Sequence, residues 1–202
     1  MKLKIKNTQI TISYTLIHLT ALCIVIGEFE SYLCCLFAVI IHEIGHLIPI
    51  NIFGEMPDKI KILLFEIYIS DSYRMKRSRK QNLIIIFFGP FVNFICFILF
   101  FLLYLFCNDS FLSLAVANLS VGLFNILPVI SFDGGQLLYL ILTKYFSDKS
   151  AERIVNIVTF IFIFPLSLLG FLLLFYSKYN FSLLLVCVYL ILTLVCKNNK
   201  YY

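Results

Sequence analysis

Long apolar runs are the feature that most limits what this chain can fold into. A helix that crosses a bilayer needs about 20 mostly apolar residues, because the hydrocarbon core is about 30 Å thick. Six stretches meet or approach this length, namely 13–27, 32–53, 83–107, 111–127, 155–176 and 181–196. The chain is 61% hydrophobic and 13% charged, whereas soluble domains carry about 25% charged residues. The sequence therefore predicts an all-α polytopic membrane protein with about six transmembrane helices.

The basic residues orient these spans. If the N-terminus lies inside, fifteen of the 16 Lys and Arg residues fall in inner segments, and only Lys178 falls outside. Short cytoplasmic loops collect Lys and Arg in this way, so both termini are expected in the cytoplasm. No nucleic-acid partner is predicted from the net charge of +5, because the basic residues flank apolar spans and do not gather on a soluble face.

Two inner segments differ from ordinary loops. Residues 60–70, after the second span, are apolar, short and partly alternating. They are expected to form a re-entrant strand or hairpin, which membranes tolerate only against protein or a wet cavity. Residues 128–136 contain Pro128 and two glycines and interrupt the apolar pattern before the short apolar run 137–145. A broken polar segment between apolar runs is typical of a site.

The second span contains His42-Glu43-Ile44-Gly45-His46, an H-E-x-x-H pattern. Residues four apart lie on one face of a helix, one turn apart, so both imidazoles can reach one metal ion. Zinc suits such ligands and keeps an open position for water in catalytic sites. Glu43 is then placed to act as the general base. Charged groups at this depth are costly and persist mainly where they pair, bind or react.

A third ligand is expected from Asp133, which precedes Gly134 and Gly135, because a carboxylate completes a His, His, carboxylate set of the catalytic kind. His18 in the first span is the rival ligand, although a hydrogen-bonded helix residue is the preferred interpretation there. Asn125 is a candidate for binding the substrate backbone or the developing oxyanion, and an interhelical hydrogen bond is an equal alternative. Asn93, after Gly89-Pro90, is assigned to helix packing or a kink.

These pieces together resemble the site-2 protease family of intramembrane zinc metalloproteases, and most of all its short bacterial branch, which includes a protease that processes a sporulation sigma-factor precursor. The matching motifs are His42–His46, Gly89–Asn93, and Asn125-x-x-Pro128 leading to Asp133–Gly135. The resemblance implies three core spans, one zinc ion held by two histidines and an aspartate, and a glutamate as catalytic base. It also implies that Asn125 engages substrate.

The resemblance further implies one membrane-embedded metalloprotease domain over residues 1–202, with a core of about 31–146. The outer loops are too short for a PDZ domain, and no C-terminal regulatory domain is expected. Two departures stand out. Phe65-Glu66 replaces the Pro- and Gly-containing chemistry of the family's membrane hairpin, and Gln136 stands where Arg or His is frequent.

The predicted function is hydrolysis of a peptide bond in or near the transmembrane segment of a membrane-bound regulatory protein, and the resemblance implies a sporulation-linked setting. The expected partners are that substrate, the lipid bilayer and a regulatory membrane protein, in a bacterial cell membrane. Two alternatives stay open. One is a membrane zincin of the prenyl-protein protease type, with Glu152 in place of Asp133 as a ligand, and the other is a catalytically silent escort protein of the same fold.

Overall fold

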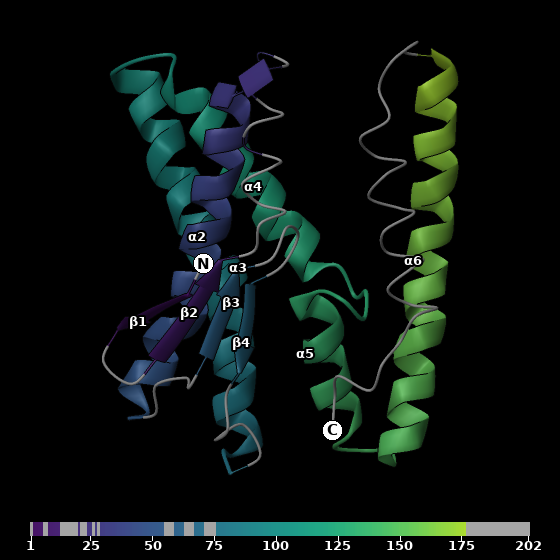
Figure 1. The fold of residues 1–202 in the computed structure, drawn as a ribbon. Coiled ribbons are helices and arrows are strands. Elements are labelled where there is room, and N and C mark those ends of the chain that lie inside the picture. Colours follow the sequence, from purple (N-terminus) through teal and green to yellow (C-terminus); the bar gives the residue numbers. More distant parts are fainter. Residues whose placement is uncertain are drawn as a thin grey trace. The chain divides into compact units, whose positions relative to one another are not determined.

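The computed structural model describes residues 2–5, 8–12, 20, 24–25, 27, 29–54, 59–62, 67–70 and 76–176. The chain divides into two compact units, Met1–Leu123 and Phe124–Tyr202. The described elements follow in the order β1 (Lys2–Ile5), β2 (Thr8–Ile12), α2 (Phe29–Ile52), β3 (Lys59–Ile62), β4 (Ile67–Ser70), α3 (Arg79–Phe106), α4 (Phe111–Ile126), α5 (Asp133–Leu142) and α6 (Asp148–Tyr176) (Figure 1).

Three of these helices are long and apolar enough to cross a membrane: α2, α3 and α6. They confirm the helices predicted over 32–53, 83–107 and 155–176. The predicted span 111–127 is also a helix, α4, but its 16 residues reach only about 24 Å. The predicted spans 13–27 and 181–196 lie mostly or wholly outside the described residues, so six spans stay a prediction.

The first unit also contains a four-stranded sheet in the order β1-β2-β3-β4. The pairs β1–β2 and β3–β4 are antiparallel, whereas β2 and β3 are parallel. The prediction of a hairpin within 60–70 is confirmed by the pairing of β3 with β4, and its depth in the membrane stays a prediction. The all-α prediction thus holds for the spans but omits this sheet, whose strands carry a period-2 alternation too short to stand out beside the long apolar runs.

Helices α2 and α3 lie side by side and run in opposite directions (Figure 1). The buried residues of α2 recur every three or four positions and form one stripe, as expected for an amphipathic face. The buried stripe of α3 starts at Ile85, one turn after a capping box at the start of the helix. In this box, Ser78 and Gln81 each accept a hydrogen bond from the other's backbone N–H. Such a box satisfies two backbone donors at the helix start.

In the second unit, α4 ends at Ile126, two residues before Pro128, as expected because proline disfavours helix in the residue before it. The loop that follows is held to α6 by a buried hydrogen bond of 2.9 Å from the Ile130 N–H to Thr159 Oγ1. Val129 packs against Ile163 of α6. The segment that leads to Asp133 is therefore anchored from both its backbone and its side chains.

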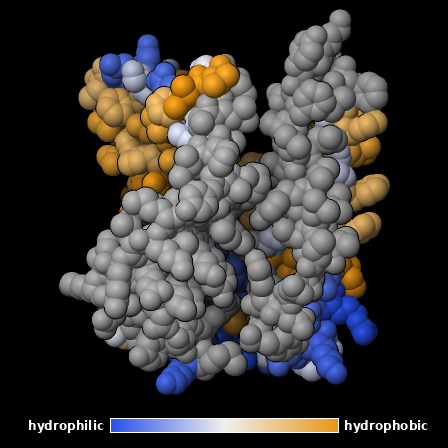
Figure 2. Space-filling view, viewed as in Figure 1, coloured by the Kyte–Doolittle hydropathy of each residue, from blue (hydrophilic) through white to orange (hydrophobic). Residues whose placement is uncertain are grey.

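Helix α6 shows the division expected of a span near its membrane boundary. Its first turns carry Asp148, Lys149, Glu152 and Arg153. Beyond them large apolar side chains are exposed, among them Phe160, Phe164 and Leu172 at 64%, 60% and 58%. Figure 2 shows the same change from hydrophilic to hydrophobic surface along α6. Exposed apolar side chains at this density mark a surface made for lipid or for another apolar partner.

Candidate metal centre

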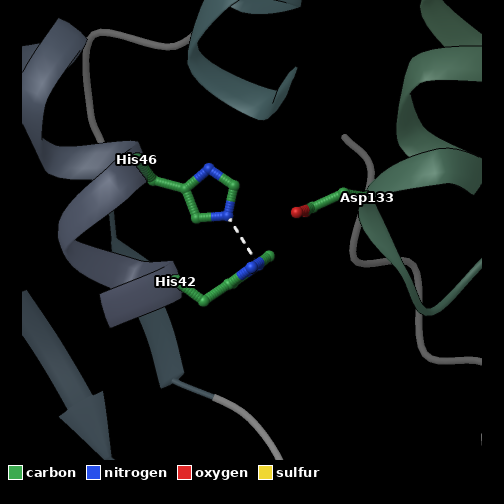
Figure 3. Close-up of side chains that lie close together, drawn as sticks. All are labelled: His42, His46 and Asp133. Carbon is green, nitrogen blue, oxygen red and sulfur yellow. Dashed lines mark hydrogen bonds between the residues drawn. The ribbon is translucent and has the colours of Figure 1, made fainter. Parts of the chain in front are cut away.

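His42 and His46 lie one turn apart near the middle of α2, and their rings are in contact in a T-shaped arrangement. The two Nε2 atoms are 3.1 Å apart (Figure 3). The rings are nearly perpendicular, with an interplanar angle of 87°. His42 is buried, with 4% of its surface exposed. The sequence prediction that this spacing brings both imidazoles together is therefore confirmed.

The other ring nitrogen of each histidine is held by an oxygen on α3. His46 Nδ1 lies 2.8 Å from the backbone carbonyl oxygen of Ile85. A carbonyl oxygen only accepts, so His46 Nδ1 carries the hydrogen and donates it. Its Nε2 then has a lone pair. A backbone carbonyl thus selects the tautomer of His46.

The tautomer of His42 is selected by Asn93. His42 Nδ1 is 2.7 Å from Asn93 Oδ1, and the Asn93 amide nitrogen donates to the backbone oxygen of Ala38 at 3.0 Å. Because Ala38 O can only accept, the Asn93 nitrogen must face it, and Asn93 Oδ1 must face the histidine. His42 therefore donates from Nδ1 and also presents a lone pair at Nε2.

Two lone pairs now point at each other across 3.1 Å. This arrangement is repulsive unless a cation lies between the nitrogens, either a proton on one ring or a metal ion. Two nitrogens that share a tetrahedral zinc ion lie about 3.3–3.4 Å apart, given zinc–nitrogen distances of about 2.0–2.1 Å. The observed spacing, and the second hydrogen bond from each ring, fit the way proteins hold catalytic zinc.

Two glycines allow the helices to approach closely enough for these contacts. A Cβ atom on Gly45 would lie 2.8 Å from the Phe88 carbonyl oxygen and 2.9 Å from Gly89 Cα. Atoms never approach so closely without a shift, so any larger residue would push α2 and α3 apart. The packing predicted for Gly89-Pro90 is confirmed, and Gly45, within the H-E-x-x-H motif, plays the same part on the facing helix.

Asp133 begins α5 in the second unit and is 8% exposed. The next two residues pack against the preceding loop, because a Cβ on Gly134 would overlap the carbonyl oxygens of Ile126 and Leu127, and one on Gly135 would overlap that of Val129. Neither glycine has a positive φ, so glycine is needed at both positions for lack of space and not for its backbone angles.

The remaining predicted residues are placed as follows. Glu43 lies on α2 next to His42 and is half-buried, and Asn125 lies in the last turn of α4 and is also half-buried. His18 lies outside the described residues. Sequence reasoning missed the role of Asn93, although a buried amide inside a long apolar run was a signal of function.

Three comparisons bear on identity. Residues 107–169 match peptidase family M50. The chain is 27% identical over 140 residues to stage IV sporulation protein FB of Bacillus subtilis (strain 168), which covers 67% of this chain and 48% of that protein. It is 25% identical over 128 residues to protein YydH of the same organism, covering 58% of this chain and 50% of that protein. The chain thus spans about half the length of the curated relatives it matches.

The fold has a close counterpart among solved structures. The site-2 protease from Methanocaldococcus jannaschii matches with a TM-score of 0.75 and 22% identity, over 100% of this chain and 96% of that one. Helices long and apolar enough to span a membrane, together with a histidine pair that can bind a cation, are the features expected of a membrane metalloprotease. Residues 107–169 and the two curated relatives make the chain similar to peptidase family M50, and the solved structure shows that it shares the fold of a site-2 protease.

Proposed function

We propose that this protein is a zinc-dependent endopeptidase that cuts a peptide bond in or near a transmembrane segment of another membrane protein. The observation that carries the proposal is the pair of Nε2 lone pairs of His42 and His46, 3.1 Å apart and each fixed by a hydrogen bond at Nδ1. Holding both rings in this tautomer, with their Nε2 atoms in contact, costs free energy unless a cation binds between them. The family match supports zinc as that cation.

Asp133 is the proposed third ligand. Each of the three side chains offers one ligand atom, an imidazole nitrogen or a carboxylate oxygen. Two neutral imidazoles and one carboxylate would leave a net charge of +1 on a bound zinc ion, and three protein ligands are the number that catalytic zinc sites use. The tight packing of Gly134 and Gly135 behind Asp133 keeps its backbone in place, as a ligand requires.

Glu43 is the proposed general base. Zinc in such a site supplies Lewis acidity, which polarises the scissile carbonyl and makes a water molecule nucleophilic at neutral pH. The Glu43 carboxylate takes a proton from the attacking water as the carbon–oxygen bond forms. It then gives that proton to the amide nitrogen as the carbon–nitrogen bond breaks, so the products are a carboxylic acid and an amine. Asn125 is proposed to bind the substrate backbone or the developing oxyanion nearby.

The substrate must reach this site as an extended strand, because a helix keeps its peptide groups engaged in its own hydrogen bonds. Among the described strands, β4 is at the edge of the sheet and pairs with β3. An edge strand presents unpaired backbone groups to a further strand. We propose that an unwound substrate segment adds to this hairpin, residues 59–70, before cleavage.

The cellular setting is proposed from two sources. The distribution of Lys and Arg supports a multi-pass protein with cytoplasmic termini in a bacterial cell membrane. The similarity to a sporulation protein supports a regulatory membrane protein as substrate and a sporulation-linked role, with a second membrane protein as regulator.

The proposal is tested by zinc content and cleavage measured on the same purified, never-chelated protein. Wild type should hold one zinc ion per chain and cut a model transmembrane substrate. Glu43→Gln should keep the zinc and cut about 10²–10⁴ times more slowly, the usual contribution of a general base. Glu30→Gln, an exposed change in the first turn of the same helix, is the matched control and should cut normally.

Each contrary result has a separate meaning. Wild type without stoichiometric zinc would refute the metal site. Unimpaired cleavage by Glu43→Gln would refute the role of Glu43 as base. Zinc-loaded wild type that cuts no membrane substrate would favour a silent escort protein of this fold.

A further inference from the structure

A chain of buried amides extends from the histidine pair to α4. Asn93 and Asn118 are fully buried, at 0% exposure each. The Asn93 amide nitrogen donates to Asn118 Oδ1 at 3.0 Å, in addition to its bond to Ala38 O. The Asn118 amide nitrogen in turn donates to the backbone oxygen of Leu114 at 2.9 Å. This series of hydrogen bonds therefore connects a backbone carbonyl of α4 to His42 Nδ1.

The donor and acceptor roles along these hydrogen bonds are determined by Leu114 O, at the end away from His42. Because Leu114 O only accepts, the Asn118 nitrogen must face it, and Asn118 Oδ1 must face Asn93. That oxygen also only accepts, so the Asn93 nitrogen must face Asn118. Both hydrogens of the Asn93 amide are then used, one toward each neighbour, and its oxygen is left for His42.

These hydrogen bonds prevent the amide group of Asn93 from rotating by half a turn. If the amide rotated by half a turn, its oxygen would face two acceptors, Ala38 O and Asn118 Oδ1, and its nitrogen would face His42 Nδ1. His42 would then have to accept at Nδ1 and carry its hydrogen at Nε2, where a metal ion must bind. With Asn118 removed, only Ala38 O would oppose this rotation.

We propose that Asn118 is a positioning residue for the metal site: through Asn93 it locks His42 in the tautomer that presents its Nε2 lone pair to zinc. The inference rests on the proposed zinc site. It assigns to α4 a role that neither the H-E-x-x-H motif nor the aspartate motif contains. Side chains that hydrogen-bond to the other ring nitrogen of a metal-binding histidine commonly set the tautomer and orientation of its ring in this manner.

The packing of α4 fits this role. Gly122 lies one turn after Asn118 on the same helix face, and a Cβ there would be 3.3 Å from Asn93 Cβ. Ala115, one turn before Asn118, is also fully buried. Small residues on both sides of Asn118 allow α4 to approach α3 closely enough for an amide-to-amide bond, as in other membrane helix pairs.

The experiment compares Asn118→Leu with Asn118→Asp in the full-length protein, with zinc affinity measured by competition against a chromophoric chelator. Leucine has a similar size but no acceptor, so zinc affinity should fall by about 10- to 100-fold, the usual effect of losing an outer-shell partner. A buried aspartic acid is neutral and has asparagine's pattern of one donor and one acceptor, so Asn118→Asp should bind zinc nearly as tightly as wild type.

A second readout follows the tautomer itself. In a His18→Asn background only His42 and His46 remain of the three histidines, and 15N spectra of the metal-free protein report which ring nitrogen carries the hydrogen. Asn118→Leu should raise the population of the Nε2–H form of His42, and Asn118→Asp should not. If Asn118→Leu does not fold, Asn118→Ala replaces it, with the same expected direction in both readouts.

The inference is overturned if Asn118→Leu binds zinc as tightly as wild type, or if Asn118→Asp loses as much affinity as Asn118→Leu. The first result would make Asn118 an ordinary interhelical contact, and the second would mean that the acceptor is not what matters. Either result would leave the proposed function intact, whereas zinc-free wild type would refute the proposed function first.

Discussion

Gly89 of α3 stands directly against the imidazole of His46 on α2. A Cβ atom at residue 89 would lie 2.5 Å from His46 Nε2 and 2.9 Å from His42 Cε1. Because Gly89 has no side chain, both rings can keep the orientation in which their Nε2 atoms meet.

Gly89→Ala should therefore abolish tight zinc binding. The new methyl group would displace one imidazole or push α3 away from α2, and either shift separates the two ligand nitrogens. We expect zinc affinity to fall by at least about 100-fold, more than the loss of an outer-shell partner usually costs. Ile95→Ala, on the same helix at a side chain 49% exposed, should bind zinc normally. Wild-type affinity in Gly89→Ala would mean that the rings do not bind a metal in this orientation.

The third ligand is tested by comparing Asp133→Ala with Glu152→Ala. If Asp133 binds the ion, its removal should lower zinc affinity by at least about 100-fold, whereas Glu152→Ala should have little effect, because Glu152 lies near the start of α6 and outside the proposed ligand set. The opposite pattern would favour a zincin of the prenyl-protein protease type. Equilibrium dialysis followed by metal analysis gives the answer for both variants.

The loop that leads to Asp133 depends on Thr159. Thr159→Val keeps the shape of the side chain but removes the acceptor for the Ile130 N–H, and an unsatisfied buried donor costs about 1–3 kcal/mol. We expect a lower thermal midpoint of unfolding in detergent and weaker zinc binding. Thr143→Val is the control, because it removes a comparable hydroxyl bond that lies within one helical turn, from Thr143 to Leu140 O at 3.1 Å. Equal midpoints for the two variants would show that the Thr159 bond does not anchor the loop.

Removal of the metal should be reversible and should also affect stability. Chelation should stop cleavage, and zinc alone should restore it. Zinc at 100 times its dissociation constant should stabilise the folded protein by about 2.7 kcal/mol, so the unfolding midpoint should rise on zinc addition. His46→Ala should show no such rise. Full activity after complete removal of zinc would contradict the proposed mechanism.

The sequence alone predicts the parts of this protein that depend on local spacing. Apolar runs of spanning length predicted the helices α2, α3 and α6, since hydropathy and length decide membrane insertion segment by segment. The spacing of His42 and His46 predicted that they share a helix face, because four residues make about one turn. Pro128 indicated the end of α4 for an equally local reason.

Other features depended on how distant segments pack. His42 and Asn93 are 51 residues apart in sequence, and Asn93 and Asn118 are 25 apart, so no local pattern indicates that their amides and ring meet. Strands β1 and β2 and the four-stranded sheet were overlooked, because pairing partners, not their own apolar content, make such segments a sheet. No local pattern in the sequence requires glycine at Gly45 or Gly89. Only the close packing of α2 against α3 makes glycine necessary at both positions.

The sequence by itself therefore determined that this is a membrane protein with two histidines on one helix face, because hydropathy and helical periodicity act over neighbouring residues. Only the tertiary structure decided which nitrogen of each histidine is presented to a metal ion. That choice depends on hydrogen-bond acceptors from a second helix, and an acceptor selects a tautomer only when packing brings it within about 3 Å of the ring.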